Sequence, residues 1–194
     1  MDIAGLSDHI NSIFPMPPER RAQVVAEFQE TRLARNGYLL REEEVNDRYV
    51  IVGSGTLRAF THDVRGDEVT TAFYGPGRIV FEVASFFQRI PSKENIVALT
   101  DVQGWELSYD RLNNLFHTFP EFREFGRRVL VMGFTALKER TLGMIHDTAE
   151  ERYARLLKMD PGLFQVAPLK YIASYLGVTD TSLSRIRKDF ATRS

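Results

Sequence analysis

The sequence contains no cysteine among its 194 residues. This absence excludes disulfides, thiolate catalysis, and zinc or iron–sulfur centres held by cysteine. It also fits a reducing compartment, and we expect a cytoplasmic protein. No apolar run approaches the ~20 residues that span a bilayer, and the acidic start, MDIAGLSDHI, does not resemble a secretory signal. We therefore expect no membrane partner.

An excess of charge of one sign is also missing. The 25 lysines and arginines are balanced by 26 aspartates and glutamates, which argues against a uniformly basic coat for nucleic acid. The distribution is uneven, because five cations and two acids from Pro168 onward leave +3 there and −4 in the preceding residues. A small basic end on an acidic body suits a local contact with phosphates, and a solvated charge run is the alternative.

The motifs of common enzyme classes are missing as well. The four histidines are scattered, and the central part of the chain holds only His62, in a predicted turn. A cupin-like metal enzyme, the main enzymatic alternative, needs histidine and carboxylate ligands clustered on facing strands. No HExxH, GxSxG or Walker A motif occurs either. We expect no enzymatic activity, no catalytic residue, no bound metal and no cofactor.

Hydrophobic periodicity predicts helical ends and a strand-rich middle. Residues 1–31 read as two helices separated by the prolines between positions 15 and 18. Short strands at regular spacing with glycine turns then favour a sandwich or barrel. The predicted strands cover residues 48–52, 56–61, 68–74, 79–81, 95–100 and 102–107. Helical patterns return at Ser108.

Residues 120–146 are predicted to form one long helix with two apolar stripes, roughly a third of a turn apart. The first stripe is Phe122, Phe125, Val129, Met132 and Ala136, and the second is Leu130, Phe134, Leu137 and Met144. One stripe can cover the strand-rich region. The other needs a second partner, and the same helix of another subunit is the simplest choice. Burial of both stripes within one chain is the alternative.

The chain after residue 146 is predicted to be mostly helical. Thr148 and Glu151 have the spacing of a capping box and begin a helix that stops before Pro161. Residues 163–166 are long enough only for an edge strand. Residues 168–190, PLKYIASYLGVTDTSLSRIRKDF, then have the length of a helix-turn-helix.

The second helix of this motif has two unlike faces. Gly177 suits the turn before it, since glycine accepts a positive φ, and Leu183, Ile186 and Phe190 form an apolar face. The opposite side offers hydroxyls and cations, which suit a major groove. The candidate DNA contacts are Thr179, Thr181, Ser182, Ser184, Arg185 and Lys188. A helical hairpin that only packs is the alternative.

This order of elements resembles the CRP/FNR family of bacterial regulators. The similarity is strongest in RYVIVGSGTLRAF, in GRIVFEVASF and in residues 148–188, where TAEERYARLL and PLKYIASYLGVTDTSLSRIRK resemble a branch common in Bacteroidetes. The resemblance implies an α+β fold with three parts. These are an antiparallel β jelly-roll sensor domain of the cyclic-nucleotide-binding type with a helical lead-in (residues 1–119), a dimerisation helix (120–146) and a helix-turn-helix DNA-binding domain (147–194).

The function implied by this resemblance is a homodimeric, sequence-specific regulator of transcription that binds double-stranded DNA. The guanine-reading arginine of the family falls on Arg185, whose alternative role is an ion pair with Asp189. Asp180 and Thr181 replace two further base readers, so the operator should differ from that of the cyclic-AMP receptor. Arg187 lies nearer the buried edge and is expected to pack. A small-molecule-binding β-roll protein without DNA function is the second alternative.

The effector site departs from the family pattern. Glu82 matches the ribose-binding glutamate, but Phe81 replaces its glycine and Ser92-Lys93 replace the phosphate-binding arginine–serine pair. Lysine offers a point charge in place of a bidentate clamp, so we expect no response to cyclic AMP. The candidate lining for an unidentified small-molecule effector, if one exists, is Glu82, Ser85, Ser92, Lys93 and Asn95. Alternatively, these residues only surround a pocket that phenylalanines fill.

Overall fold

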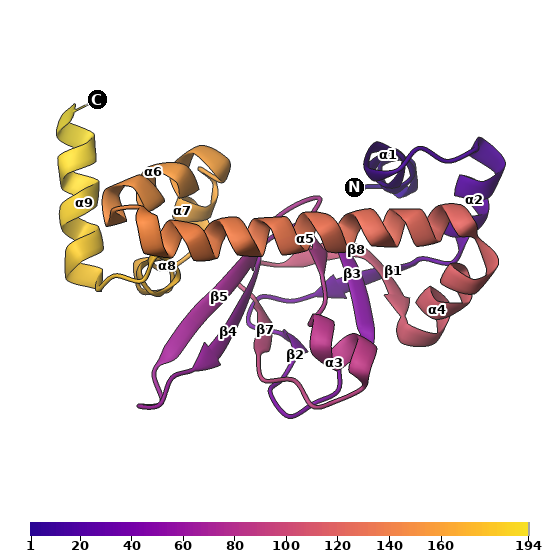
Figure 1. Ribbon diagram of the computed structural model, residues 1–194, viewed down its shortest axis with the longest axis horizontal. Helices are drawn as coiled ribbons and strands as arrows, with labels where there is room; N and C mark the ends of the chain where they lie inside the picture. The colour runs from indigo at the N-terminus through magenta and orange to yellow at the C-terminus, as the bar shows by residue number, and fades with distance from the viewer. Residues whose placement is uncertain (194) are drawn as a thin grey trace.

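The computed structural model describes residues 1–193, and Figure 1 shows a β-domain crossed by one long helix. The elements in chain order are α1 (Ile3–Ile13), α2 (Pro18–Ala26), β1 (Gln29–Leu33), β2 (Tyr38–Leu40), β3 (Arg48–Ser54), β4 (Leu57–His62), β5 (Glu68–Tyr74), β6 (Ile79–Val80), α3 (Val83–Gln88), β7 (Asn95–Ala98), β8 (Val102–Ser108), α4 (Tyr109–Thr118), α5 (Pro120–His146), α6 (Ala149–Met159), α7 (Leu163–Val166), α8 (Leu169–Leu176) and α9 (Asp180–Arg193).

The eight strands form two antiparallel sheets with the orders β1-β8-β3-β6 and β2-β7-β4-β5. Apolar side chains of β3 and β4, such as Val52, Leu57 and Ala59, are buried together in one core cluster. The alternation of side chains along a strand places Leu57 and Ala59 on one face of β4 and Arg58 on the other. The antiparallel β-domain expected from the sequence is confirmed.

The structure differs from the sequence-based expectation in several stretches, and neither β2 nor α3 was predicted. Residues at the end of the predicted helical lead-in form β1, because this polar segment pairs along β8 from Gln29 to Leu33. Residues 163–166 form the short helix α7 and not an edge strand. The carboxylate of Asp160 accepts a hydrogen bond from Leu163 N at 3.1 Å, which stabilises the turn that leads into α7.

The long helix α5 spans 27 residues, as predicted, but only its ends are supported by its own chain. Phe122 and Phe125 are fully buried near α1, α2 and α4, and their rings stack at 5.2 Å. Arg128 adds a hydrogen bond of 3.0 Å to the carbonyl of Ile13. From Leu130 onward most side chains of α5 are exposed. No helix of residues 1–193 is both long and apolar enough to cross a membrane.

The helices after α5 share a separate apolar core. Tyr153 of α6 packs edge-on against Phe164 and Phe190, at centroid distances of 5.4 and 5.2 Å. The predicted capping box is present at the start of α6, where Thr148 Oγ1 accepts from Glu151 N and the Glu151 carboxylate accepts from Thr148 N. This core therefore gives α9 a rigid support.

Helix α8 also packs against strand β5 of the β-domain. Ser174 Oγ donates a hydrogen bond of 2.9 Å to Thr70 Oγ1, and the Tyr175 ring meets Phe73 edge-on at 5.3 Å. Arg140 of α5 donates to the carbonyl of Tyr175 at 3.2 Å and stacks on its ring. The helical C-terminal region is thus held against both the sheet and the long helix.

Candidate nucleic-acid interface

The turn between α8 and α9 depends on Gly177. Its φ is 67° and its ψ is 36°, a left-handed conformation that side chains disfavour. A Cβ at this position would also collide with the terminal methyl of Met144 on α5. The turn therefore fits closely against the long helix, and this fixes where α9 begins.

Thr179 caps the start of α9, as predicted from the sequence. Its hydroxyl accepts from Ser182 N at 3.2 Å and donates to Ser182 Oγ at 3.0 Å. Two of the candidate DNA contacts thus already stabilise the helix that presents them.

The inner face of α9 is buried and its outer face is exposed. Leu183 and Ile186 belong to the C-terminal core, and Phe190 packs against it. The structure places all six candidate DNA contacts at exposed positions, and the outward-facing ones carry hydroxyl or cationic groups. In Figure 1, α9 stands at one end of the molecule, nearly perpendicular to α5 and away from both sheets.

The cations of this outer face have no acidic partner within the described residues. Arg185 and Lys188 form no ion pair there, so the alternative pairing of Arg185 with Asp189 is not made. Arg187 is exposed, so the expectation that it packs is wrong; the core is filled by its neighbours Leu183 and Ile186. Unpaired guanidinium and ammonium groups on a supported helix can contact phosphates and base edges.

The exposed part of α5 forms a second candidate interface. Phe134, Leu137 and Ile145 are 67%, 60% and 70% exposed, which is unusual for large apolar side chains. The stripe that begins at Phe122 is buried only at its start, because Met132 and Ala136 face solvent. Both stripes are therefore uncovered along the second half of the helix, and the alternative that one chain buries them is wrong.

Four of the five candidate effector residues make hydrogen bonds within the chain. The carboxylate of Glu82 accepts from Ala84 N at 3.1 Å and Ser85 N at 2.6 Å, which caps α3. Ser85 Oγ accepts from Asn46 N at 2.8 Å, and Ser92 Oγ donates to the Glu94 carbonyl at 2.8 Å.

The remaining two candidates, Lys93 and Asn95, lie just before and at the start of β7. Asn95 Oδ1 accepts from Glu42 N at 3.1 Å, whereas the Lys93 side chain is exposed. Phe81 packs among aromatic rings, with centroids 5.0 Å from Tyr49 and 5.5 Å from Phe86. The structure therefore shows hydrogen bonds within the chain for four of the five candidates, and it places Phe81 in an aromatic cluster.

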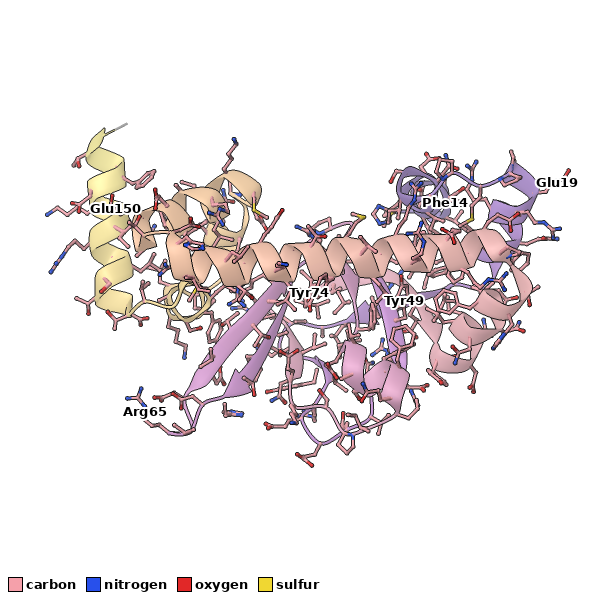
Figure 2. The ribbon with its side chains drawn as sticks, in the orientation of Figure 1. Phe14, Glu19, Tyr49, Arg65, Tyr74 and Glu150 are labelled. Atoms are coloured by element: carbon pink, nitrogen blue, oxygen red, sulfur yellow. The ribbon has the colours of Figure 1, made fainter. Side chains whose placement is uncertain are left out.

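The contacts that Glu94 and Tyr74 make in this region were not anticipated from the sequence. Glu94 lies near Thr71, Glu82 and Arg140, and burial raises the pKa of its carboxyl group. Figure 2 shows Tyr74 below α5, where burial raises the pKa of its hydroxyl. Arg140 thus adjoins Glu94 on one side and Tyr175 of α8 on the other. Sequence spacing gives no sign of such contacts between distant segments.

Within residues 1–193, no group of three or more histidines and carboxylates is arranged to hold a metal.

Comparisons with known proteins agree with this architecture. The model of the cyclic nucleotide-binding domain family matches residues 30–119. The fumarate and nitrate reduction regulatory protein of Vibrio cholerae is 28% identical over 155 residues, which are 74% of this chain and 61% of that relative. The chain thus matches less than two thirds of the length of this curated relative.

Two solved structures show the same fold at lower sequence identity. FixK2 from Bradyrhizobium japonicum has a TM-score of 0.72 at 20% identity, covering 86% of this chain and 85% of its own. A structure from Eubacterium rectale, assigned to the CRP/FNR family of transcriptional regulators, has a TM-score of 0.69 at 13% identity, covering 94% and 88%. The β-domain, the long helix and the helical C-terminal region, together with these matches, show that the chain contains a cyclic nucleotide-binding domain and has a fold similar to that of CRP/FNR-type regulators.

Proposed function

We propose that this chain is a transcription regulator that binds double-stranded DNA through the outer face of α9. The observation that carries the proposal is that Arg185 and Lys188 form no ion pair within residues 1–193, on a helix whose opposite face packs against the C-terminal core. Arg185 would read guanine O6 and N7, a contact worth ~1–3 kcal/mol of discrimination. Thr179 and Ser182 would position the helix on the phosphate backbone.

The proposed regulator is a homodimer that assembles through α5. The exposed side chains of Phe134, Leu137 and Ile145 would be covered by the same helix of a second subunit. A two-fold dimer also presents two copies of α9, which a pair of operator half-sites requires. In this arrangement residues 1–119 are the sensor, 120–146 the dimerisation helix and 147–194 the DNA-binding domain.

Cyclic AMP is not the proposed effector. Phe81 stands where the family has a glycine, and its ring packs against Tyr49 and Phe86. Ser92 and Lys93 provide no bidentate partner for a phosphate. Loss of such groups usually removes recognition of the ligand. The relatives with known family membership are regulators, and no enzymatic activity is proposed.

The proposal is tested by selecting bound fragments from a random DNA library with the full chain. A shared sequence that appears twice with two-fold symmetry would support it, and binding should weaken steeply with salt. The Arg185→Ala variant should lose the sequence preference and keep the fold. Arg32→Ala, an exposed cation on β1, is the matched control and should select the same sequence as the wild type. Failure to enrich any sequence at low salt would favour the alternative of a ligand-binding protein without DNA function.

A further inference from the structure

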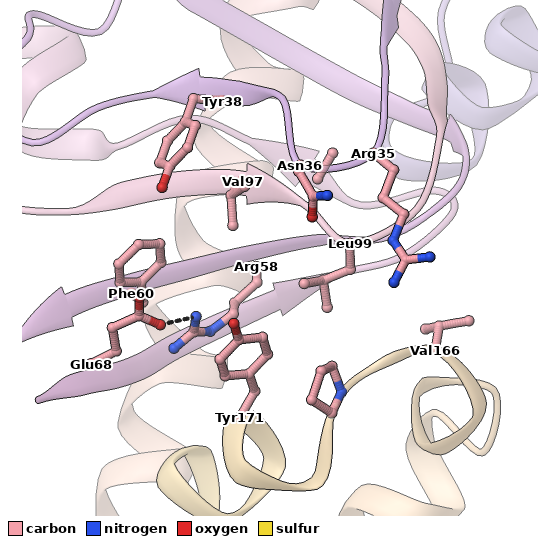
Figure 3. Close-up of a pocket in the computed structure, with 12 residues that line it drawn as sticks. Arg35, Asn36, Tyr38, Arg58, Phe60, Glu68, Val97, Leu99, Val166 and Tyr171 are labelled. Atoms are coloured by element: carbon pink, nitrogen blue, oxygen red, sulfur yellow. Dashed lines mark hydrogen bonds and ion pairs between the residues drawn. The ribbon is translucent and has the colours of Figure 1, made fainter.

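A cavity of about 320 Å³ lies between the β2-β7-β4-β5 sheet and the start of α8 (Figure 3). Arg58 and Phe60 of β4 line one side, on the face of the strand opposite Leu57 and Ala59. Tyr171 of α8 closes the other side. The volume is near the lower end for ligand pockets, so it suits a small ligand. Its walls come from the β-domain and from the helical C-terminal region.

Arg58 is the unusual residue of this cavity, because it is charged and only 1% exposed. Its Nε donates to Thr70 Oγ1 at 2.9 Å and its Nη1 to Glu68 Oε2 at 2.6 Å. Its Nη2 has no hydrogen-bond partner in the described part of the chain. A buried donor without a partner costs free energy that an acceptor on a ligand would recover.

Aromatic rings hold this guanidinium in place. Its carbon lies 3.6 Å from the ring centroid of Tyr171 and 4.4 Å from that of Phe60. Stacking between rings restricts the plane of the guanidinium and leaves its edge for hydrogen bonds. An arginine fixed in this way can recognise a planar or tetrahedral anion with little loss of side-chain entropy.

The charge around the cavity also favours an anion. Arg35 lines it as a second cation and forms no ion pair within residues 1–193. Figure 3 shows Arg35 on the side of the cavity that faces Val166. Glu68 is the one carboxylate among the lining residues, and Arg58 already pairs with it. Pro168 at the start of α8 also lines the cavity, and no side chain caps that helix end.

We infer that this cavity binds a small organic anion, whose carboxylate or phosphate group accepts from Arg58 and is neutralised by Arg35. The site is separate from the candidate effector residues between Glu82 and Asn95. It goes beyond the proposed function, since it adds a ligand site between the sensor and the helix-turn-helix. An anion bound there stabilises the contact between strand β4 and α8, and so favours the placement of α9 seen in this structure.

The test measures thermal unfolding of the full chain in sodium phosphate and, separately, in sodium succinate, with sodium chloride keeping the ionic strength constant. A specific anion raises the Tm in a saturable manner, by about 5 °C at a hundredfold excess over its Kd. The anion that gives the larger rise identifies the ligand group as phosphate or carboxylate. No DNA is present, so the result is independent of the proposed DNA binding.

Variants of the lining residues show whether the anion binds in this cavity. Arg35→Ala should weaken the apparent affinity for the anion at least about tenfold, because it removes a cation from the cavity. Arg32→Ala, a nearby exposed arginine outside the lining, should respond as the wild type does. Arg185→Ala should also respond normally, which separates this site from α9. Arg58→Lys should lose the response if it folds. The inference is overturned if neither anion gives a saturable rise, or if Arg35→Ala responds as strongly as Arg32→Ala.

Discussion

Ser174 Oγ of α8 lies 2.9 Å from Thr70 Oγ1 of β5, and the same Oγ accepts from Thr70 N at 3.1 Å. This pair of hydrogen bonds connects residues 104 positions apart and joins the helix-turn-helix to the β-domain. Thr70 Oγ1 also accepts from Arg58, so the contact extends to the buried guanidinium. The position of α9 relative to the sheets therefore depends in part on these polar contacts.

Ser174→Ala is expected to loosen this connection without unfolding either part. The loss of hydrogen bonds to Thr70 should lower the free energy of unfolding by about 0.5–1.5 kcal/mol, because a partly buried donor and acceptor are left unpaired. Urea denaturation measures the change. Ser184→Ala, an exposed serine of α9, is the control and should alter stability by less than about 0.5 kcal/mol. Equal stabilities for the two variants would show that the contact contributes nothing.

Phe134→Glu should convert a dimer into a monomer and leave the fold intact. The side chain is 67% exposed, so a carboxylate there is solvated in one chain but would be buried between two apolar helices in the proposed dimer. Light scattering after size-exclusion chromatography gives the mass directly. Val64→Glu at the tip of the β4–β5 hairpin, which is fully exposed, is the matched control and should not change the mass. A wild-type chain that is monomeric at high concentration would contradict the proposed assembly.

Gly177→Ala should destabilise the C-terminal helices by more than about 1 kcal/mol. The new Cβ would occupy a left-handed conformation and would also press against Met144. Thermal unfolding and DNA binding should both be affected, because the turn sets the start of α9. In the double variant Gly177→Ala/Met144→Ala, the collision is removed and the backbone strain remains. The double variant should therefore stay less stable than Met144→Ala alone; equal stabilities would rule out backbone strain.

The Glu94→Gln variant should become more stable relative to the wild type as the pH rises. Burial raises the pKa of the Glu94 carboxyl above its ordinary value of 4.5, so the folded state holds this proton more tightly than the unfolded state. The stabilisation from the bound proton is complete below pH 4.5 and is lost as the pH rises through the higher folded pKa. Glutamine stays neutral and avoids this loss.

The measurement for Glu94 is urea denaturation of both proteins between pH 4.5 and 8. The difference in unfolding free energy between variant and wild type should shift in favour of the variant as the pH rises. Glu30→Gln on β1, whose side chain is exposed, is the control and should show no such trend. A constant difference for Glu94→Gln across this range would contradict the raised pKa.

Local patterns predicted much of this fold. The apolar spacing of Phe122 and Phe125, the capping box at Thr148 and the turn glycine Gly177 each act within a few residues, so the sequence reveals them. The short strand β1 was not predicted, because its polar residues gain their order from pairing with β8, far along the chain. The turn α7 was mistaken for a strand, since four residues carry no usable periodicity.

The candidate sites were predictable to different degrees. The outer face of α9 follows from helical spacing, and the structure presents its side chains as expected; whether they bind DNA stays a prediction. Nothing in the sequence indicated that Arg58 is buried, because an arginine in an alternating strand normally faces solvent. Its burial requires Tyr171, which lies more than a hundred residues away and reaches it only after α8 has packed on the sheet. The assignment to a branch common in Bacteroidetes also stays a prediction.

The uncovered middle of α5 has a mechanical consequence. The helix is about 40 Å long at 1.5 Å per residue, and its own chain contacts it mainly near Phe122 at one end and near Met144 at the other. While the middle of α5 is exposed, the helix can bend there, and a small rotation of its end at the β-domain would not reach its other end. Once another surface stiffens that stretch, the same rotation reaches the turn at Gly177. In the proposed dimer, a variant such as Phe134→Glu that does not assemble would therefore leave this stretch of α5 free to bend.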